Sequence, residues 1–473
     1  MEQRTQSGYK TVTYFVCATA ALGGLLFGLD QGFIANSLGT IKQVYNLDLK
    51  GAEHYSSILA TGSIFGALLA GVFARFLGRK KSLLLAGFLF SAASSLSAFL
   101  PHLHILFGCR FALGFAVGIA SFVVPLYLSE TAPASIRGAM GTLFQLLITI
   151  GIFLISVTNV TIVHWIVDPR YALSTMFAVI VVFALLMFLG CFILPESPRW
   201  LLLKGRKDQA VDVLTKVLNT DEEVRSEIAG IESTLHHAGA SLGIVFRKYF
   251  FKVLLVGVGL QMFQQLVGIN VMIYYAPTIL GYAGLTGLVG MMTVPTVNML
   301  FTFPAIHLVE RWGRKKLLYV GAVCMFVTMV AAGVAFHLVG DVSDPSQVGG
   351  LPKTILLVSV IVYIFGFAVS WGPVAWLVCS EIFPLEGREI GMTITTMVNW
   401  TFAGLLMDNS LTFMHTYGNS SIFFLFSGFC IAAVFFVALF VPETKGVNLE
   451  AIESNLRGGE KMRNLGKAAA GDR

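Results

Sequence analysis

The chain has 473 residues, of which 56% are hydrophobic and only 12% are charged, and it contains 39 phenylalanines. This composition excludes an ordinary soluble globular protein and indicates a polytopic membrane protein. The formal net charge of +6 comes from basic residues dispersed over many loops, which argues against a nucleic-acid-binding surface.

Apolar runs of about 20 residues predict twelve membrane-spanning helices. The first run is too long for a secretory signal peptide and lacks a small-residue cleavage site, so we expect it to remain as span one. The predicted spans are residues 13–34, 55–75, 82–101, 105–128, 139–160, 172–194, 251–277, 286–309, 316–339, 354–378, 390–414 and 421–441.

Basic residues are unevenly distributed among the loops between these spans. The loops after spans two, four, eight and ten are rich in arginine and lysine, whereas the alternate loops hold only Lys42, Lys50, Arg170 and Lys353. By the positive-inside rule, both termini are expected in the cytoplasm and the chain in the cell inner (plasma) membrane.

Two buried charges are expected to meet near the outer side. Span one carries Asp30 among glycines that suit close helix packing, and span four carries Arg110. Since successive spans run in opposite directions, both side chains should lie in the outer third of the membrane. An aspartate beside an arginine stays ionised, and withdrawal of the arginine would let the buried acid take up a proton. The pair is a candidate proton carrier; a fixed ion pair joining the two spans is the alternative.

Three signatures occur twice in the same order, which predicts two related halves of six spans. Gly-Arg-Lys-Lys follows spans two and eight, Ser-Glu with a later arginine follows spans four and ten, and Pro-Glu follows spans six and twelve. We expect the charged members to pair in a cytoplasmic network when the inner side is shut. The candidate network residues are Arg79, Glu130, Arg137, Glu196, Arg199, Arg314, Glu381, Arg388 and Glu443.

The expected fold is an all-α membrane protein with two six-helix bundles, the first over 1–194 and the second over 251–441. Residues 195–250 have the charge and spacing of short amphipathic cytoplasmic helices, and 442–473 form a cytoplasmic tail. A Gly-rich phosphate-binding loop with lysine is absent from the sequence, so ATP is not expected to drive the protein.

Span seven is unusually polar between Gln261 and Pro277. Its amides and tyrosines are costly to leave unpaired in hydrocarbon. On a straight helix the glutamines would face away from Asn270 and Tyr274, so we expect a break at Gly268 that lets both sets converge, with Pro277 limiting the helix beyond it. Uncharged donors and acceptors suit a neutral polyol such as a sugar. The alternative is that the amides only join neighbouring helices.

Other polar and aromatic residues lie in the remaining spans. Gly372-Pro373 is expected to loosen span ten near two tryptophans, and tryptophan beside amides is common in sugar sites. Asp408, near the outer boundary of span eleven, is a lesser proton-carrier candidate. His307 and the six single cysteines are interpreted as packing residues without metal-ligand spacing.

These residues resemble the sugar porter family of the major facilitator superfamily over almost the whole chain, in particular its bacterial galactose/proton and arabinose/proton symporters. The resemblance is carried by GGLLFG before Asp30, the paired Gly-Arg-Lys-Lys loops, PLYLSE, PESPRW, the QQ-G-N-YYAP stretch, GP-W and PETK. It implies alternating access around a central sugar site, with Asp30 and Arg110 as the proton-coupling pair. The implied sugar-site residues are Phe27, Gln145, Gln264, Gln265, Asn270, Asn298, Gly372, Trp376, Asn399 and Trp400, and the implied outer-gate residues are Tyr274 and Tyr275.

Two positions depart from the family pattern. Leu29 replaces the usual tyrosine before the span-one aspartate, which changes the hydrogen bonding expected around Asp30. The loop after span two has Arg75 where the superfamily usually has aspartate, which puts that half of the inner lock in question.

The expected function is proton-driven import of a neutral hexose, such as galactose or glucose, or a pentose, such as arabinose or xylose. A facilitative uniporter and a non-transporting sugar sensor are the alternatives. Drug export is possible on fold alone, but a pocket for apolar cations should hold fewer amides. An enzyme is disfavoured because the sequence has no nucleophile and base constellation. The expected partners are the monosaccharide, a proton and the lipid bilayer, without cofactor, metal, ATP or nucleic acid, and a monomer suffices.

Overall fold

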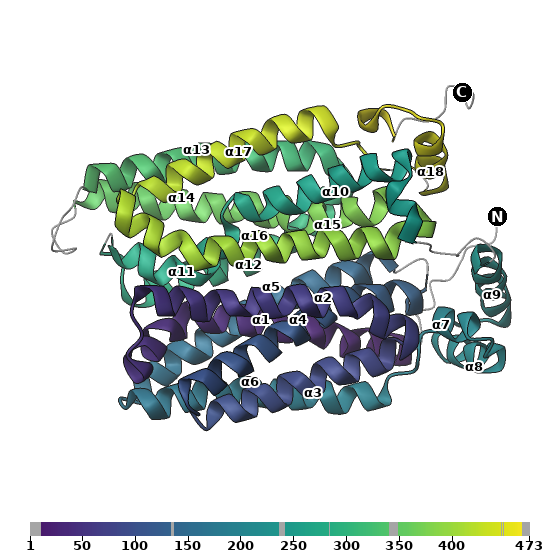
Figure 1. Ribbon diagram of the computed structural model, residues 1–473, viewed down its shortest axis with the longest axis horizontal. Helices are drawn as coiled ribbons and strands as arrows, with labels where there is room; N and C mark the ends of the chain where they lie inside the picture. Colours follow the sequence, from purple (N-terminus) through teal and green to yellow (C-terminus); the bar gives the residue numbers. More distant parts are fainter. Residues whose placement is uncertain are drawn as a thin grey trace.

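The computed structural model describes residues 11–133, 137–235, 242–282, 284–339, 349–445, 447 and 449–465. Within these residues, 12 segments are long and apolar enough to cross a membrane, and no strand occurs. They form two bundles that lie side by side (Figure 1). The first bundle contains α1 (Thr11–Tyr45), α2 (Leu49–Phe76), α3 (Arg79–Ala98), α4 (Leu103–Thr131), α5 (Arg137–Trp165) and α6 (Pro169–Ile193).

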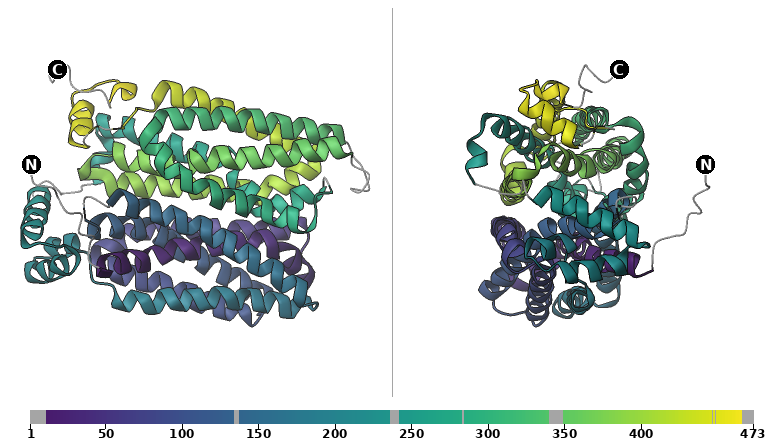
Figure 2. Two further views of the ribbon diagram at one scale, coloured as in Figure 1. Left: turned by 180° about the vertical axis from the view of Figure 1, so that it is seen from behind. Right: turned by 90° about the vertical axis from the view of Figure 1, so that its right-hand side faces the viewer.

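The second bundle repeats six spans, two of which are interrupted. Its helices are α10 (Lys248–Leu266), α11 (Ile269–Tyr282), α12 (Gly287–Trp312), α13 (Arg314–Val339), α14 (Gly350–Val369), α15 (Trp371–Ile382), α16 (Arg388–Tyr417) and α17 (Ser421–Phe440). The end-on view in Figure 2 shows the two bundles as separate groups of helices.

Short helices lie at one end of the bundles (Figures 1 and 2). We name this the linker end, and the opposite end, where α1 ends at Tyr45 and α2 begins at Leu49, the distal end. The short helices are α7 (Pro198–Leu203), α8 (Lys207–Val217), α9 (Asp221–Leu235), η1 (Leu242–Phe246), η3 (Leu385–Gly387), α18 (Leu449–Arg457) and η4 (Met462–Asn464).

Glycines allow the helices of the first bundle to approach closely, as the sequence predicts for span one. A Cβ atom at Gly28 of α1 would lie 2.0 Å from the carbonyl oxygen of Ile148 in α5. The same contact recurs between α2 and α4, where a Cβ at Gly62 would lie 2.1 Å from the carbonyl oxygen of Phe111. Small residues thus bring the backbones together where lipid offers no hydrophobic driving force.

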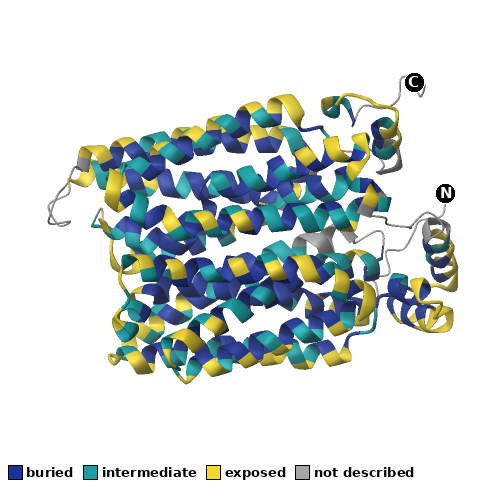
Figure 3. Cartoon of the chain, viewed as in Figure 1, coloured by how far each residue is buried: buried dark blue, intermediate teal, exposed yellow. Residues whose placement is uncertain are grey.

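Buried residues concentrate between the helices, and exposed residues lie along the outward faces (Figure 3). Many of these outward residues are large and apolar, including Phe88, Leu186 and Phe435. An apolar exterior is the surface that a lipid bilayer would cover.

Span seven breaks where the sequence predicts. α10 ends at Leu266, and Gly268 has a φ of 98°, a left-handed conformation that costs glycine little. The hydroxyl of Tyr363 donates to the freed carbonyl of Val267 at 2.9 Å. Pro277 does not limit the helix as expected, because α11 continues through it to Tyr282. A membrane-spanning helix tolerates the loss of the one backbone hydrogen bond that proline removes, because neighbouring helices and side chains can satisfy the freed carbonyl.

Span ten breaks earlier than the sequence predicts. The interruption falls at Ser370, with φ −129° and ψ −88°, and not at Gly372-Pro373. Pro373 instead lies in the first turn of α15, where backbone N–H groups have no partner within the helix, so its missing N–H costs little.

Candidate functional site

Five amide side chains of the second bundle form one hydrogen-bonded group. We name Gln261, Gln264, Gln265, Asn270 and Asn399 the amide cluster; all five are buried. Asn399 Nδ2 donates to Gln264 Oε1 at 2.6 Å and to Gln261 Oε1 at 2.7 Å. Gln265 Nε2 in turn donates to Asn399 Oδ1 at 3.0 Å. Buried amides on three helices therefore satisfy one another around a compact polar centre.

The break at Gly268 completes this cluster. Asn270 follows the break on α11, and its Nδ2 donates to Gln265 Oε1 at 2.7 Å. The predicted convergence of the two amide sets is thus present. Gln264 Nε2 also donates to the carbonyl of Trp371 at 3.1 Å and to that of Gly372 at 3.3 Å, so the cluster touches both interrupted spans.

One further amide comes from the first bundle. Gln31 of α1 donates from Nε2 to Asn270 Oδ1 at 3.1 Å, and its side chain is buried. Sequence reasoning missed this residue; an amide directly after Asp30 in an apolar span was the available signal. With Gln31, the polar centre bridges the two bundles.

Aromatic residues from both bundles lie beside each other. The rings of Phe27 and Trp400 have centroids 5.5 Å apart. The Nε1 donor of Trp400 is buried without a hydrogen-bond partner among the described residues. An unpaired buried donor next to a polar centre is a position where a ligand hydroxyl can accept.

The other predicted sugar-site residues are placed but not joined to the cluster by any hydrogen bond within the described ranges. Gln145 lies half-buried on α5, Asn298 buried on α12 and Trp376 half-buried on α15. Helices α5 and α12 contact each other across the two bundles.

Asp30 and Arg110 form the predicted ion pair. Arg110 Nη1 lies 2.5 Å from Asp30 Oδ1, and each side chain is 1% exposed. Asp30 Oδ2 and two guanidinium nitrogens, Nε and Nη2, have no partner among the described residues. A buried pair with unsatisfied atoms contributes little net stability, because desolvation offsets the attraction.

Two tyrosines surround this pair. The guanidinium carbon of Arg110 lies 5.7 Å from the ring centroid of Tyr55. Tyr274 of α11 lies near Arg110 and Asp30, and its hydroxyl makes no hydrogen bond of standard geometry in the described structure. The predicted gate residue thus also faces the charged pair.

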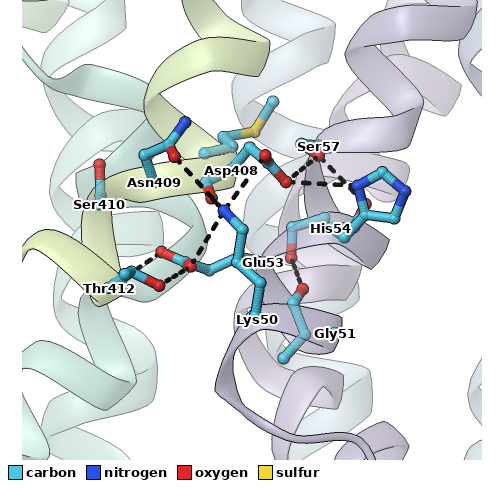
Figure 4. A network of polar contacts seen from close by, with 12 residues as sticks. Lys50, Gly51, Glu53, His54, Ser57, Asp408, Asn409, Ser410 and Thr412 are labelled. Carbon is cyan, nitrogen blue, oxygen red and sulfur yellow. Dashed lines mark hydrogen bonds and ion pairs between the residues drawn. The ribbon is translucent and has the colours of Figure 1, made fainter. Parts of the chain in front are cut away.

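Polar contacts join the two bundles at the distal end (Figure 4). Lys50 Nζ of α2 lies 3.2 Å from Asp408 Oδ2 of α16, and Ser57 donates to Asp408 Oδ1 at 3.0 Å. The fully buried Glu53 carboxylate accepts from the backbone N–H of Thr412 at 2.8 Å and from its hydroxyl. We name these five residues the distal contact. Asp408, expected at the membrane boundary, therefore lies in an interface between the bundles.

The second predicted gate residue, Tyr275, also contacts α16 on the distal side. Tyr275 is buried on α11 and donates from its hydroxyl to the carbonyl of Met407 at 2.7 Å. The distal side of the polar centre is accordingly covered by α11 and α16.

The charged residues at the linker end form two matching sets. Arg79 Nη2 lies 2.7 Å from Glu130 Oε1 in the first bundle, and Arg314 Nη2 lies 2.7 Å from Glu381 Oε1 in the second. Each of these two ion pairs therefore joins residues of a single bundle and does not connect the two bundles. A longer contact of 3.7 Å between Arg79 and Glu389 of α16 does cross between the bundles.

Among the described residues, Glu196 and Glu443 form no ion pair with an arginine side chain, unlike the sequence prediction. Glu196 Oε1 accepts from the backbone N–H of Arg79 at 2.8 Å, and Glu443 Oε1 from that of Arg314 at 2.9 Å. They cap the N-termini of α3 and α13, where unpaired N–H groups and the helix dipole favour a carboxylate. Gly78, before α3, has a φ of 93°, a conformation that favours glycine, and a Cβ there would lie 2.2 Å from Glu196 Oε2.

The remaining network candidates differ in their placement. Arg388 donates from Nε and Nη2 to the carbonyl of Phe383 at 3.4 Å. Arg199 lies half-buried in α7. The side chain of Arg137 lies outside the described part of the structure.

Two bundles around a buried polar centre, with a separate buried ion pair and interrupted helices, define a membrane transporter of the major facilitator fold and not an enzyme. The chain belongs to the family described as "Sugar (and other) transporter", whose model matches residues 16–456.

Among curated proteins, the chain is 38% identical over 462 residues to the galactose-proton symporter of Escherichia coli strain K12, covering 97% of each chain. It is 35% identical over 467 residues to the arabinose-proton symporter of the same strain, covering 97% of this chain and 96% of the relative. Among solved structures, it is similar to the proton:xylose symporter XylE bound to 6-bromo-6-deoxy-D-glucose, with a TM-score of 0.78, 29% identity and coverage of 96% and 98%. A partially occluded inward-open conformation of XylE from E. coli has a TM-score of 0.80 with 29% identity, covering 93% of this chain and 100% of that chain.

Proposed function

We propose that this protein is a proton-coupled symporter that imports a neutral monosaccharide, a hexose or a pentose, by alternating access. The observation that carries the proposal is the pairing of two buried polar sites: an uncharged amide cluster and an isolated Asp30–Arg110 ion pair. The similarity to galactose-proton, arabinose-proton and proton:xylose symporters supports the same reading.

The amide cluster binds the sugar. In the absence of ligand its members donate to one another, and a sugar replaces these hydrogen bonds with bonds to its hydroxyls at little net cost. The free Nε1 of Trp400 adds a donor, and its ring and that of Phe27 offer apolar surface to the C–H faces of the sugar. Gln145, Asn298, Gly372 and Trp376 line the remainder of the site.

Asp30 carries the proton. When it is ionised, the pair with Arg110 is intact; when it is protonated, the attraction is lost and α1 and α4 can move relative to each other. Sugar and proton bind from the outside, closure over the sugar opens the inner side, and Asp30 releases its proton as Arg110 approaches. The interrupted spans α10–α11 and α14–α15 provide hinges for that closure.

The membrane orientation follows from charge. The linker end holds most of the loop arginines and lysines, which favours a cytoplasmic linker end with both termini on that side of a cell inner membrane. Residues 1–194 and 251–441 are then the two moving bundles, joined by 195–250 and followed by the tail 442–473. A single chain contains the whole site, so the working unit is a monomer.

The decisive experiment follows the external pH of a weakly buffered, de-energised suspension of vesicles that contain the protein. Galactose, arabinose, glucose and xylose are added in turn, with Asp30→Asn in parallel. Alkalinisation on addition of one sugar, lost in Asp30→Asn, is the expected result and identifies the substrate. Entry of labelled sugar without any change in pH would overturn symport and leave a uniporter.

A further inference from the structure

Gln31 is adjacent in sequence to Asp30 of the ion pair and contacts Asn270 of the amide cluster. It directly follows Asp30 on α1, and successive helical residues point about 100° apart, so the two side chains leave α1 on neighbouring faces. Asp30 faces Arg110 of α4, whereas Gln31 faces Asn270 of α11. One turn of α1 therefore contacts both the ion pair and the amide cluster.

The partner helix repeats this arrangement. Asn270 and Tyr274 are four residues apart on α11 and thus share a face. Asn270 accepts a hydrogen bond from Gln31, and Tyr274 lies near both members of the ion pair. Because α11 is a short helix beyond the break at Gly268, it can move as a unit with these two contacts.

The hydrogen bonds between these amides run in one direction. Gln31 donates to Asn270, Asn270 to Gln265, and Gln265 to Asn399. In this series of four hydrogen-bonded amides, Gln31 is the member that belongs to the first bundle, and its side chain is buried, with 6% exposed. Chains of buried amides polarise one another, so a change at one end alters the donors at the other.

We propose that Gln31 is a positioning residue that couples the protonation of Asp30 to the orientation of Asn270 in the sugar site. The inference rests on the proposed symport function. Movement of α1 when the ion pair opens shifts Gln31 and releases or re-aims Asn270 toward a sugar hydroxyl. In the reverse direction, a sugar hydroxyl that donates to Asn270 Oδ1 displaces Gln31, so α1 is no longer held to α11 by this hydrogen bond.

The test uses Gln31→Met, which keeps the length of the side chain but removes the amide, and Gln31→Asn, which keeps the amide but is one methylene too short for the contact. Two rates are measured in proteoliposomes: exchange of labelled sugar at equal concentrations and pH on both sides, and accumulation driven by an imposed pH gradient. Exchange needs no net proton movement, whereas accumulation needs coupling.

Linked sites typically change each other's affinity about 5–150-fold, so we expect both variants to lose at least about fivefold in accumulation while exchange stays within about threefold. The matched control is Asn36→Leu, which removes another buried amide of α1 whose atoms have no partner among the described residues. It should retain both activities.

An equal loss of exchange and accumulation in the Gln31 variants would overturn the proposal, since it would assign Gln31 a structural role. Full accumulation in Gln31→Met, or loss of accumulation in Asn36→Leu to the same degree, would overturn it too. Failure of the proposed function is a separate result: the unchanged protein would then move sugar without any sugar-induced uptake of protons.

Discussion

Several side-chain atoms near the centre of the protein are buried and unpaired among the described residues, namely Asp30 Oδ2, two nitrogens of Arg110, the hydroxyl of Tyr274 and Nε1 of Trp400. A buried polar group without a partner costs about 1–3 kcal/mol, so such groups are rare in folded proteins. These atoms belong to the ion pair, to Tyr274 beside it and to Trp400 next to Asn399 of the amide cluster, so at these places a substrate, a proton or a second conformation can supply the missing partner.

At the residue scale, removal of the Asn270 amide should weaken sugar binding. Asn270→Ala leaves a sugar hydroxyl and Gln265 without their partner, at a cost of about 1–3 kcal/mol, or roughly 5–150-fold in Kd. Titration calorimetry with the transported sugar measures the change. The control Gln43→Ala, at an exposed position of α1, should bind normally. Unchanged affinity in Asn270→Ala would move the sugar site elsewhere.

Removal of Arg110 should make stability depend on pH. Arg110→Leu leaves Asp30 buried without a counter-charge, and breaking a buried pair in this way costs about 3–5 kcal/mol while the acid is ionised. A proton on Asp30 removes the charge, so the variant should be less stable at pH 8 than at pH 5.5, the loss appearing as pH rises. Thermal unfolding at both values tests this, and the double variant with Asp30→Asn should lose the difference. Equal destabilisation at both pH values would contradict the expectation.

At the element scale, the close contact of α1 with α5 depends on glycines whose side-chain positions are already occupied. A matched pair of substitutions on α1 separates this packing from helix propensity. Gly28→Ala places a Cβ 2.0 Å from the carbonyl oxygen of Ile148, and Gly39→Ala meets nothing within 4 Å. Overpacking costs about 1–3 kcal/mol or more, whereas alanine at an open helical site gains about 0.5–1 kcal/mol. Detergent thermal-shift assays should show a lower melting temperature for Gly28→Ala only; similar values for both would refute close packing.

At the scale of the whole molecule, charged and polar side chains help to hold the two bundles together at the distal end. Contacts of this kind expose groups that water can solvate when they open. The distal contact is therefore suited to repeated opening, and its charges should set how often the distal side is open.

Reversal of one charge should open this side more often. Lys50→Glu places like charges beside Asp408, and since a half-exposed ion pair is worth about 0.2–1 kcal/mol, we expect a roughly threefold rise in distal opening. The readout is the rate at which a membrane-impermeant thiol reagent, added from the distal side, labels Ala60→Cys. Ala60 lies about one helical turn beyond Ser57 on α2 and packs against Gly404 of α16. Native cysteines are buried or half-buried in the described structure.

The double variant Lys50→Glu with Asp408→Lys restores opposite charges and should return labelling to the original rate. If the single and double variants label alike, the distal contact does not govern opening. Gln43→Ala changes an exposed polar side chain near the distal end of α1 that is not part of the distal contact, leaves the net charge unaltered and serves as the control.

The sequence by itself determined the number and order of the spans, the duplication into two halves and the break at Gly268. These properties follow from local chemistry: the length of apolar runs, repeated motifs, and a glycine among amides that no straight helix can aim at one point. It also placed Asp30 and Arg110 at similar depth, which is enough to predict their contact.

Only the tertiary structure decided which partners the polar groups choose. The carboxylates of Glu196 and Glu443 cap helices, Asp408 joins the bundles, and Gln31 reaches Asn270 across the interface. Each choice depends on which helix faces which, and helix rotation within a membrane is set by packing against neighbours. A polar side chain in a predicted span indicates that a partner is needed, but the packing of the assembled bundles decides which residue that partner is.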